Sequence, residues 1–377
     1  MKATLLAFLS LFAASAIVQA SPISSQRGNG IRDIRRRQPP KHLIQTSADS
    51  EPKWLSESDI LGLIQKKIKF MDITHHQDLD KNVIKSYAST IPTEPKYQTE
   101  VKPVIDALDT NNMKTNLEGF TKFNNRYYKS TTGAESSKWL LQQVTAAAKG
   151  SNVTVKAFTH RWAQSSVIAR FEGSDSSLSN QVVVIGAHQD SINQNNPTSG
   201  RAPGADDDGS GTVTILETFR SLVQNNFKPE RPVEFHWYSA EEAGLLGSQD
   251  IASAYQKKGV EVVAMLQNDM TGYIGDNGEV VGVVTDFVDD QLTEFVKKLI
   301  ETYLSIPYKE TQCGYGCSDH ASFTKAGYPS AFAIESLFDD SNQYIHSEQD
   351  TIEKVSFDHM KEFSKLAAGF AVELSHK

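Results

Sequence analysis

Residues 181–188 read QVVVIGAH, an unbroken run of apolar and mostly β-branched residues that ends at His188. A continuous apolar run of this length is typical of a parallel strand that is buried on both faces of its sheet. A loop with the sequence GADDDGSG (204–211) follows, and a helical pattern then covers residues 210–226. The order of strand, loop and helix predicts one unit of an α/β sheet.

The same alternation continues toward the C-terminus. Strand patterns cover residues 232–242, 261–270, 279–286 and 328–336, and helical patterns cover 243–259, 288–304 and 356–375. Alternating strands and helices predict an α/β fold, with a mostly parallel, mixed β-sheet sandwiched by helices on both faces.

The composition is that of a globular protein. The chain has 377 residues, of which 39% are hydrophobic and 22% are charged, and this mixture is far from that of a disordered chain. The formal net charge of −8 favours neither nucleic acid nor an anionic lipid surface as a partner. We expect a monomer.

The first twenty residues have the features of a secretory signal peptide. Lys2 precedes an apolar run from Leu5 to Val18, and Val18-Gln19-Ala20 is a small-residue cleavage signal. The alternative is a membrane anchor, but the run is shorter than the roughly 20 residues that a spanning helix needs. We therefore expect cleavage after Ala20 and a secreted, extracellular protein. Asn152 begins an N-glycosylation acceptor, Asn-Val-Thr, that fits this route.

Residues 21–88 have the layout of a prosegment ahead of a catalytic domain at 89–377. They include an amphipathic helical pattern, SDILGLIQKKIKF (58–70), and a Pro/Thr-rich linker (89–100) follows them. Residues 1–87 hold 13 Lys and Arg against 8 Asp and Glu, and the remainder holds 25 against 38. A basic leader could therefore bind an acidic body. The alternative is that 21–88 is an N-terminal subdomain.

Ionisable residues gather where the predicted strands end. Parallel strands bring their carboxyl ends to one edge of the sheet, where ligands bind in α/β folds, and the GADDDGSG loop lies at the same edge. The residues placed there are His188, Glu241, Glu242, Asp269 and Glu335, with His346 eleven residues beyond the last strand end.

This set of residues predicts a metal site. Each residue alone has an ordinary explanation, and three adjacent aspartates are commonly a solvated turn, but four strand ends with ligand-type residues favour a metal. An EF-hand is excluded, because its loop would begin at Gly204 and Ile215 stands at the twelfth position. Mixed imidazole and carboxylate ligands suit Zn²⁺, with Mn²⁺ or Co²⁺ as alternatives.

The number of donors predicts two metals. Two histidines and at least three carboxylates exceed what one zinc needs, and two ions that share a carboxylate would use them all. Such a pair can bind a water, lower its pKa and stabilise developing charge. Of the neighbours Glu241 and Glu242, one would be a ligand and the other a general base.

Six motifs carry a resemblance to a known family. They are GAHQD (186–190), APGADDDGSG (202–211), YSAEEAGLLGSQD (238–250), LQNDM (266–270), CGYGCSDHASF (313–323) and YIHSEQDT (344–351). In order and spacing they resemble the secreted bacterial and fungal leucine aminopeptidases, zinc exopeptidases with a co-catalytic di-zinc site. The resemblance runs from about residue 100 to the C-terminus.

The resemblance implies a role for each motif residue. His188 and His346 would each bind one zinc, Asp207 would bridge both, and Glu242 and Asp269 would complete the two sets. Glu241 would be the general base on the metal-bound water. Asp190 would orient His188 by a hydrogen bond, and the Asp207–Asp208 peptide bond would be cis. The role of Asp206 stays open.

The family hydrolyses the first peptide bond of peptides with a free N-terminus, preferably after leucine or another large apolar residue. Tyr315 matches a tyrosine that helps to stabilise the oxyanion. Ser341 departs from the bacterial pattern, which has an aromatic residue there. The apolar wall of the side-chain pocket matches Met270, Val284, Phe332, Ile334, Phe338 and Ile345.

The two cysteines, Cys313 and Cys317, lie in CGYGC. Half of a zinc ribbon is one interpretation, but the chain has no second cysteine pair. A short-loop disulfide suits a secreted chain, and the family has this bridge. It would hold the loop that carries Tyr315.

Three other functions remain as hypotheses. A carboxypeptidase or deacylase of the same architecture would need a cationic group for a substrate carboxylate, and no arginine stands in the six motifs. A glutaminyl cyclase would usually hold one zinc rather than two. A secreted binding module would keep the fold without activity.

Overall fold

The computed structural model describes residues 40–81 and 91–377. The predicted signal peptide (1–20) lies outside the described residues, and so do 21–39 and 82–88 of the predicted prosegment.

Within the described residues, the main sheet has eight strands in the order β10-β9-β11-β8-β6-β7-β5-β4. The strand β6 is parallel to β7 and β8, and β8 is parallel to β11, whereas β5 is antiparallel to β4 and β7, and β9 is antiparallel to β11. The predicted mixed, mostly parallel sheet is confirmed. The bounds are β4 Thr154–Phe158, β5 Ser166–Phe171, β6 Gln181–His188, β7 Val233–Tyr238, β8 Glu261–Asn268, β9 Val281–Val284, β10 Tyr308–Thr311 and β11 Ser330–Ile334.

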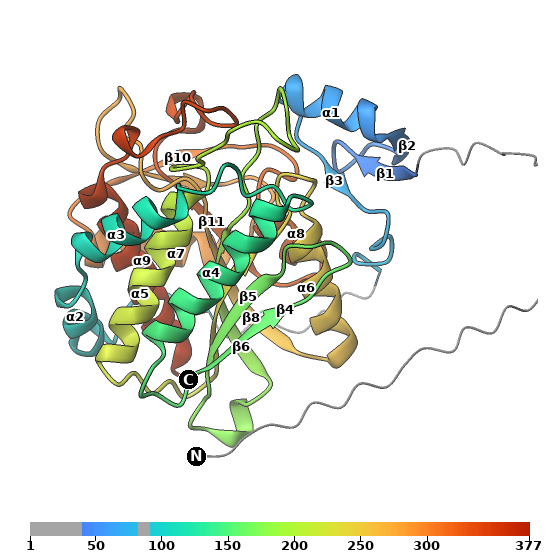
Figure 1. The fold of residues 1–377 in the computed structure, drawn as a ribbon. Helices are drawn as coiled ribbons and strands as arrows, with labels where there is room; N and C mark the ends of the chain where they lie inside the picture. The colour runs from blue at the N-terminus through green and yellow to red at the C-terminus, as the bar shows by residue number, and fades with distance from the viewer. Residues whose placement is uncertain (1–39, 82–90) are drawn as a thin grey trace, which may run out of the picture. The chain divides into compact units, whose positions relative to one another are not determined.

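Helices cover both faces of this sheet (Figure 1). One face packs against α2 (Gln98–Asp106), α4 (Thr131–Ala147), α5 (Gly209–Gln224), α7 (Asp290–Tyr303) and α9 (Phe357–Ser375), while α3 (Thr110–Phe120) packs on α5 and α9. The other face packs against α6 (Leu246–Lys258) and α8 (His320–Lys325).

The strand β6 shows why the run at 181–188 is apolar throughout. Val183 and Ile185 belong to the core on the α5 side, whereas Val182 and Val184 belong to the core on the α6 side. Successive side chains of a strand point to opposite faces, so a strand covered on both faces needs apolar residues at every position. The predicted bounds of this strand match those of β6, and the other predicted elements end within a few residues of the observed ones.

Residues 40–81 fold as a small unit that we call the N-terminal module. It holds β1 (Lys41–Gln45), β2 (Lys53–Ser56) and β3 (Met71–Asp72), which pair as an antiparallel sheet, and the helix α1 (Glu57–Gln65). The amphipathic pattern correctly indicated a helix, but the sheet was not predicted.

The module packs directly on the rest of the fold. Its Ile44, Ile60 and Phe70 share an apolar cluster with Tyr127 and Ile192, and residues 40–377 form one compact unit. The module therefore lies in contact with the part of the chain that holds the main sheet.

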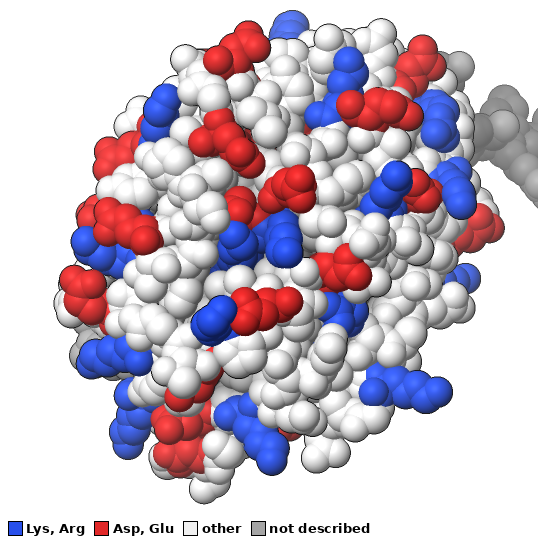
Figure 2. Space-filling view, turned by 90° about the vertical axis from the view of Figure 1, so that its left-hand side faces the viewer, with Lys and Arg blue, Asp and Glu red and all other residues white. Residues whose placement is uncertain are grey.

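Figure 2 shows acidic and basic side chains interspersed over the face it presents, without a continuous field of one sign. Mixed charges of this kind are typical of a well-solvated protein surface. Among the described helices, none combines the length and the hydropathy that crossing a membrane requires.

Candidate metal centre

The ends of three neighbouring strands bring most of the predicted ligands together. His188 is the last residue of β6, Asp269 follows β8 directly, and Glu242 lies four residues after β7. Asp207 comes from the loop before α5, and His346 from the loop after β11. Because β6 pairs with both β7 and β8, these segments meet at one edge of the sheet.

Asp207 lies between the two histidines. One of its carboxylate oxygens is 3.1 Å from Nε2 of His188, and the other is 3.0 Å from Nε2 of His346. On the first side Asp269 approaches the same nitrogen at 3.5 Å, and on the second side Glu242 does so at 2.9 Å. The five predicted ligands therefore form two groups that share one carboxylate.

These residues fit a divalent cation. Burial disfavours a charged imidazole, but Asp269 and its neighbouring carboxylates raise the pKa of His188 well above its usual value, and Glu242 and Asp207 do the same to His346. The cluster therefore attracts positive charge, and Oε1 of Glu242 is buried without a hydrogen-bond donor. Two imidazoles among carboxylates match the donor preference of zinc.

Asp208 contributes to the site through backbone contacts. One of its oxygens accepts from the His188 amide at 2.9 Å, and the other accepts from the amides of Gly211 (2.9 Å) and Met270 (3.0 Å). It thus ties together the ends of β6 and β8 and the start of α5. Asp208 also lies within ligand range of His188 and Asp269, and its oxygens already accept these three backbone hydrogen bonds. The Asp207–Asp208 peptide bond is cis, as the resemblance implies.

Asp190 joins two of the metal-site segments. Its carboxylate lies 3.5 Å from Nδ1 of His188 and accepts from the backbone amides of Glu241 (3.0 Å) and Glu242 (3.3 Å). The carboxylate lies beside His188, but Nδ1 of His188 has no hydrogen-bond partner, so the expected hydrogen bond is not formed. The contacts with the two glutamates were not predicted.

The backbone is left-handed at three positions around the site. Ala240 precedes Glu241, Met270 follows Asp269, and His346 is itself a predicted ligand; their φ angles are 61°, 58° and 57°. Non-glycine residues rarely adopt such angles, and strain of this kind concentrates at functional sites.

Glu241 lies beside the cluster but makes none of its ion pairs. Burial raises the pKa of Glu241 well above its usual value, and the nearby Glu242 and Asp269 raise it further while His188 opposes them. A carboxyl group with a raised pKa holds a proton more readily than a solvated glutamate does, which suits a group that transfers protons.

Asp206 lies away from the two groups. Its side chain accepts from the Gly272 amide at 3.1 Å and from Nδ2 of Asn342 at 2.9 Å, and it pairs with the buried carboxyl group of Glu335. Glu335, whose position after the last strand suggested a ligand, accepts from the amides of Tyr273 and Asn342 instead. This pair anchors loops around the site.

A cavity of about 260 Å³ opens next to Glu241, Glu242 and His346. Of the six predicted pocket residues, Phe338 and Ile345 line it. The other four, Met270, Val284, Phe332 and Ile334, are buried behind these two in the same apolar cluster. The N-terminal module supplies part of the opposite wall through Ile64, Ile68 and Phe70.

Comparison with known proteins identifies the family. The model of peptidase family M28 matches residues 166–371, which is more than half of the chain. The chain belongs to peptidase family M28. The peptidase is 50% identical to leucine aminopeptidase 1 of Phaeosphaeria nodorum over 353 residues, which cover 90% of each protein. It is 49% identical to leucine aminopeptidase 1 of Coccidioides posadasii over 354 residues, 89% of this chain and 90% of that protein.

Solved structures agree with this assignment. The LapA aminopeptidase of Legionella pneumophila is 30% identical and superposes with a TM-score of 0.78 over 91% of this chain and 96% of that one. LapB of the same organism gives a TM-score of 0.76 at 29% identity, covering 88% and 95%. Family and donor set together make this M28 peptidase a zinc-dependent hydrolase.

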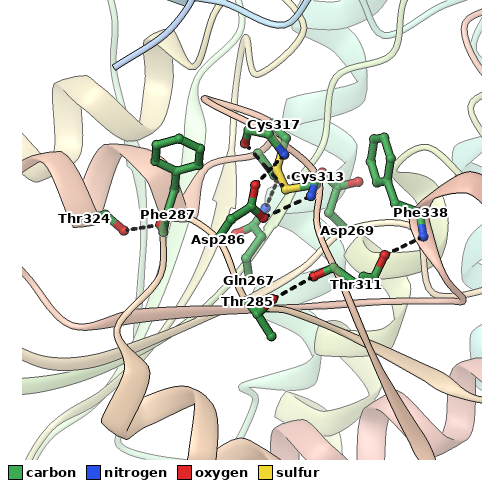
Figure 3. The surroundings of a disulfide bond; sticks show 12 residues. Gln267, Asp269, Thr285, Asp286, Phe287, Thr311, Cys313, Cys317, Thr324 and Phe338 are labelled. Atoms are coloured by element: carbon green, nitrogen blue, oxygen red, sulfur yellow. Dashed lines mark hydrogen bonds between the residues drawn. A yellow bond between two sulfur atoms is a disulfide. The ribbon is translucent and has the colours of Figure 1, made fainter. Parts of the chain in front are cut away.

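The predicted disulfide between Cys313 and Cys317 is present in the peptidase, which excludes the zinc-ribbon alternative. Figure 3 shows the Asp286 carboxylate beside it. This carboxylate accepts from the amides of Cys313 (3.0 Å) and Gly314 (2.9 Å). A bridge and a carboxylate thus both hold the loop that carries Tyr315.

Tyr315 has an unexpected partner. Its hydroxyl donates to Oε1 of Gln45, in β1 of the N-terminal module, at 2.7 Å, and Nζ of Lys325 donates to the same oxygen at 2.7 Å. The predicted oxyanion donor is therefore engaged by the module. No local pattern around Gln45 could have indicated this contact.

Two further residues of the site escaped the sequence analysis. Arg126 and Asp350 are both buried against the loop that carries Asp207. Arg126 is a cationic group near the site, but it is 0% exposed, and three of its donors bind backbone carbonyls. It is therefore not free to bind a substrate carboxylate.

Proposed function

We propose that this peptidase is a secreted leucine aminopeptidase with a di-zinc centre. One observation carries the proposal: the two oxygens of Asp207 face the two histidines at 3.1 and 3.0 Å. His188 and Asp269 would hold one zinc, His346 and Glu242 the other, and Asp207 would bridge them. The relatives at about 50% identity, named leucine aminopeptidases, support the activity.

Bound zinc would supply Lewis-acid polarisation of the scissile carbonyl and acidify the attacking water. Glu241 would accept the water proton at its carboxylate and pass it to the departing amine. Its position beside the cluster but outside the ion pairs leaves this carboxylate free for that task. Asp190 and Asp208 would keep His188 and the two glutamates in place through the contacts described above.

The substrates would be peptides with a free N-terminus. Phe338 and Ile345 line the cavity beside Glu241, and an apolar wall there favours leucine or another large apolar side chain. Met270, Val284, Phe332 and Ile334 would support that wall from behind. Tyr315 would donate to the oxyanion once its hydroxyl is free.

Residues 21–88 would be a prosegment, removed after the signal peptide (1–20), so that 89–377 is the mature enzyme. The N-terminal module forms part of the cavity wall and accepts a hydrogen bond from the Tyr315 hydroxyl. Both contacts support the proposal that the prosegment masks the active site. The enzyme would act outside the cell as a monomer, with Asn152 glycosylated. Equal activity and refolding yield with and without residues 21–88 would contradict the masking proposal.

Metal analysis and a substrate panel test the function. We expect two zinc ions per chain, hydrolysis of leucine amide, and no hydrolysis of its N-acetylated form. Glu241→Gln should lower kcat by roughly 10²–10⁴-fold, while the exposed Glu294→Gln should leave kcat unchanged. Cleavage of the blocked amide would rule out an aminopeptidase, and one zinc per chain would rule out the di-zinc centre.

A further inference from the structure

The loop 203–207, which ends at Asp207, has its backbone held by two buried side chains, one basic and one acidic. Arg126 binds its carbonyl groups, and Asp350 binds its amide groups. Arg126 comes from the connection between α3 and α4, and Asp350 comes from the loop that carries His346. Both are buried, with 0% and 1% exposure.

Arg126 fixes the carbonyl side of the loop. Its guanidinium donates to the carbonyl oxygens of Pro203 and Gly204, the latter at 2.8 Å, and its Nε donates to the Gln189 carbonyl at 2.7 Å. Gln189 follows His188 directly, so one side chain joins the two loops that present His188 and Asp207. A guanidinium can serve several acceptors at once because its five donors form a rigid fork.

The charge of Arg126 persists at neutral pH. Burial lowers its pKa to about 10, although Asp350 and nearby carboxylates oppose this shift. The guanidinium also lies over the ring of Phe120, 4.2 Å from the centroid. The side chain is therefore a fixed cation with an immobile position.

Asp350 fixes the amide side of the same loop. Its two carboxylate oxygens accept from the amides of Asp206 (3.0 Å) and Asp207 (3.1 Å), and its backbone carbonyl accepts from Ala205 at 3.2 Å. Asp350 lies four residues after His346, so its contacts also tie the second histidine loop to Asp207. Unlike a neutral side chain, a carboxylate can accept from two successive amides with both oxygens.

We propose that Arg126 and Asp350 are positioning residues that together place the Asp207 carboxylate between the two histidines and so determine how tightly the centre holds its metal. The proposal rests on the di-zinc function above. The two side chains hold the loop from both sides, Arg126 through its carbonyl groups and Asp350 through its amide groups. Neither residue touches the proposed ligand atoms, so both act through the backbone of 203–207.

Zinc release to a chromogenic chelator tests the proposal with purified, zinc-loaded protein. Arg126→Lys keeps the positive charge but loses the planar guanidinium that binds several carbonyl groups at once. Asp350→Asn keeps the shape of the side chain but replaces one of its two accepting oxygens by an amide nitrogen. We expect each variant to release zinc at least roughly tenfold faster than wild type, the scale typical of outer-sphere partners of metal ligands. The double variant should release zinc about as fast as the faster of the two single variants, because both substitutions act on the same loop.

Arg231→Lys is the matched control. Arg231 is also buried, at 3% exposure, but it lies two residues before β7, beyond the end of that strand opposite to the site. Zinc release from Arg231→Lys should equal that of wild type. Cobalt-loaded Arg126→Lys and Asp350→Asn should show altered visible absorption bands, which report ligand geometry, while Arg231→Lys should not. Release rates within twofold of wild type in both variants, or unchanged cobalt spectra, would overturn the proposal.

One measurement remains decisive if a variant does not fold. In the wild-type holoenzyme, the amides of Ala205, Asp206 and Asp207 should exchange hydrogen as slowly as those of α5, and fast exchange would overturn the proposal. The zinc content of wild type separates the di-zinc proposal from the positioning proposal. Fewer than two ions per chain would contradict the di-zinc centre. Two ions per chain, with zinc release unchanged in the variants, would contradict the positioning roles of Arg126 and Asp350.

Discussion

The buried carboxylate of Glu234 should make the stability of this peptidase depend on acid pH. Glu234 lies in β7, is 4% exposed, and accepts from Nη1 of Arg170 at 2.7 Å. Its other oxygen binds Nε2 of His236 at 2.8 Å and the hydroxyl of Tyr255. Burial alone would raise its pKa, but these three partners outweigh burial and lower the pKa to about 2.

The magnitude follows from that shift. A fall from 4.5 to about 2 corresponds to about 3.4 kcal/mol, at 1.36 kcal/mol per pKa unit. Because the folded pKa is the lower one, this stabilisation is complete well above pH 4.5 and is lost as the pH falls toward 2. About 2.6 kcal/mol remains at pH 4, and about 1.4 kcal/mol at pH 3.

The perturbation is Glu234→Gln, which keeps the shape and removes the titration. The free energy of unfolding should be measured by urea denaturation for both proteins at pH 7, 4 and 3, so that effects common to both cancel. The difference should be about 3 kcal/mol at pH 7 and should shrink by more than half at pH 3. A difference that is constant over this range would refute the assignment of the effect to the Glu234 charge.

Three further predictions concern the module, the disulfide and the pocket. Gln45→Ala in the unprocessed chain removes two hydrogen bonds, worth about 2 kcal/mol together, and should raise leucine amide hydrolysis roughly 30-fold; an unchanged rate would contradict masking through Tyr315. Replacing Cys313 and Cys317 by serine should lower the free energy of unfolding by about 2 kcal/mol, since the closed loop is short, and urea titration would show it. Ile345→Trp should narrow the cavity and lower kcat/KM for leucine amide at least roughly tenfold while alanine amide changes less; equal losses would place Ile345 outside the pocket.

The parts of the fold that the sequence predicted are those with a strong local signal. The run at 181–188 is apolar at every position because β6 is covered on both faces, and GADDDGSG marks its loop by composition. The small sheet of the N-terminal module was missed, because its strands β1 and β2 have partly exposed faces and carry no such run. The order of strands also needs contacts between distant segments, which no local pattern contains.

The same distinction applies to the site. His188, Asp207 and Glu242 stand at strand ends or in an acidic loop, so their types and places both point to a ligand role. Arg126 is one arginine in a polar and aromatic stretch, and its importance depends on carbonyl groups that are more than sixty residues away in the chain. Long-range contacts to backbone atoms leave no trace in the local sequence.

The distribution of the site along the chain also affects when the enzyme can become active. During synthesis, His188, Asp207, Glu242 and Asp269 leave the ribosome first, while His346 and Asp350 belong to the final loop before α9. A nascent chain that ends before this loop therefore carries four of the five proposed zinc ligands and lacks His346. Termination before this loop would yield a fragment that lacks one of the proposed zinc ligands, His346, and the carboxyl group of Asp350 that binds the Asp207 loop.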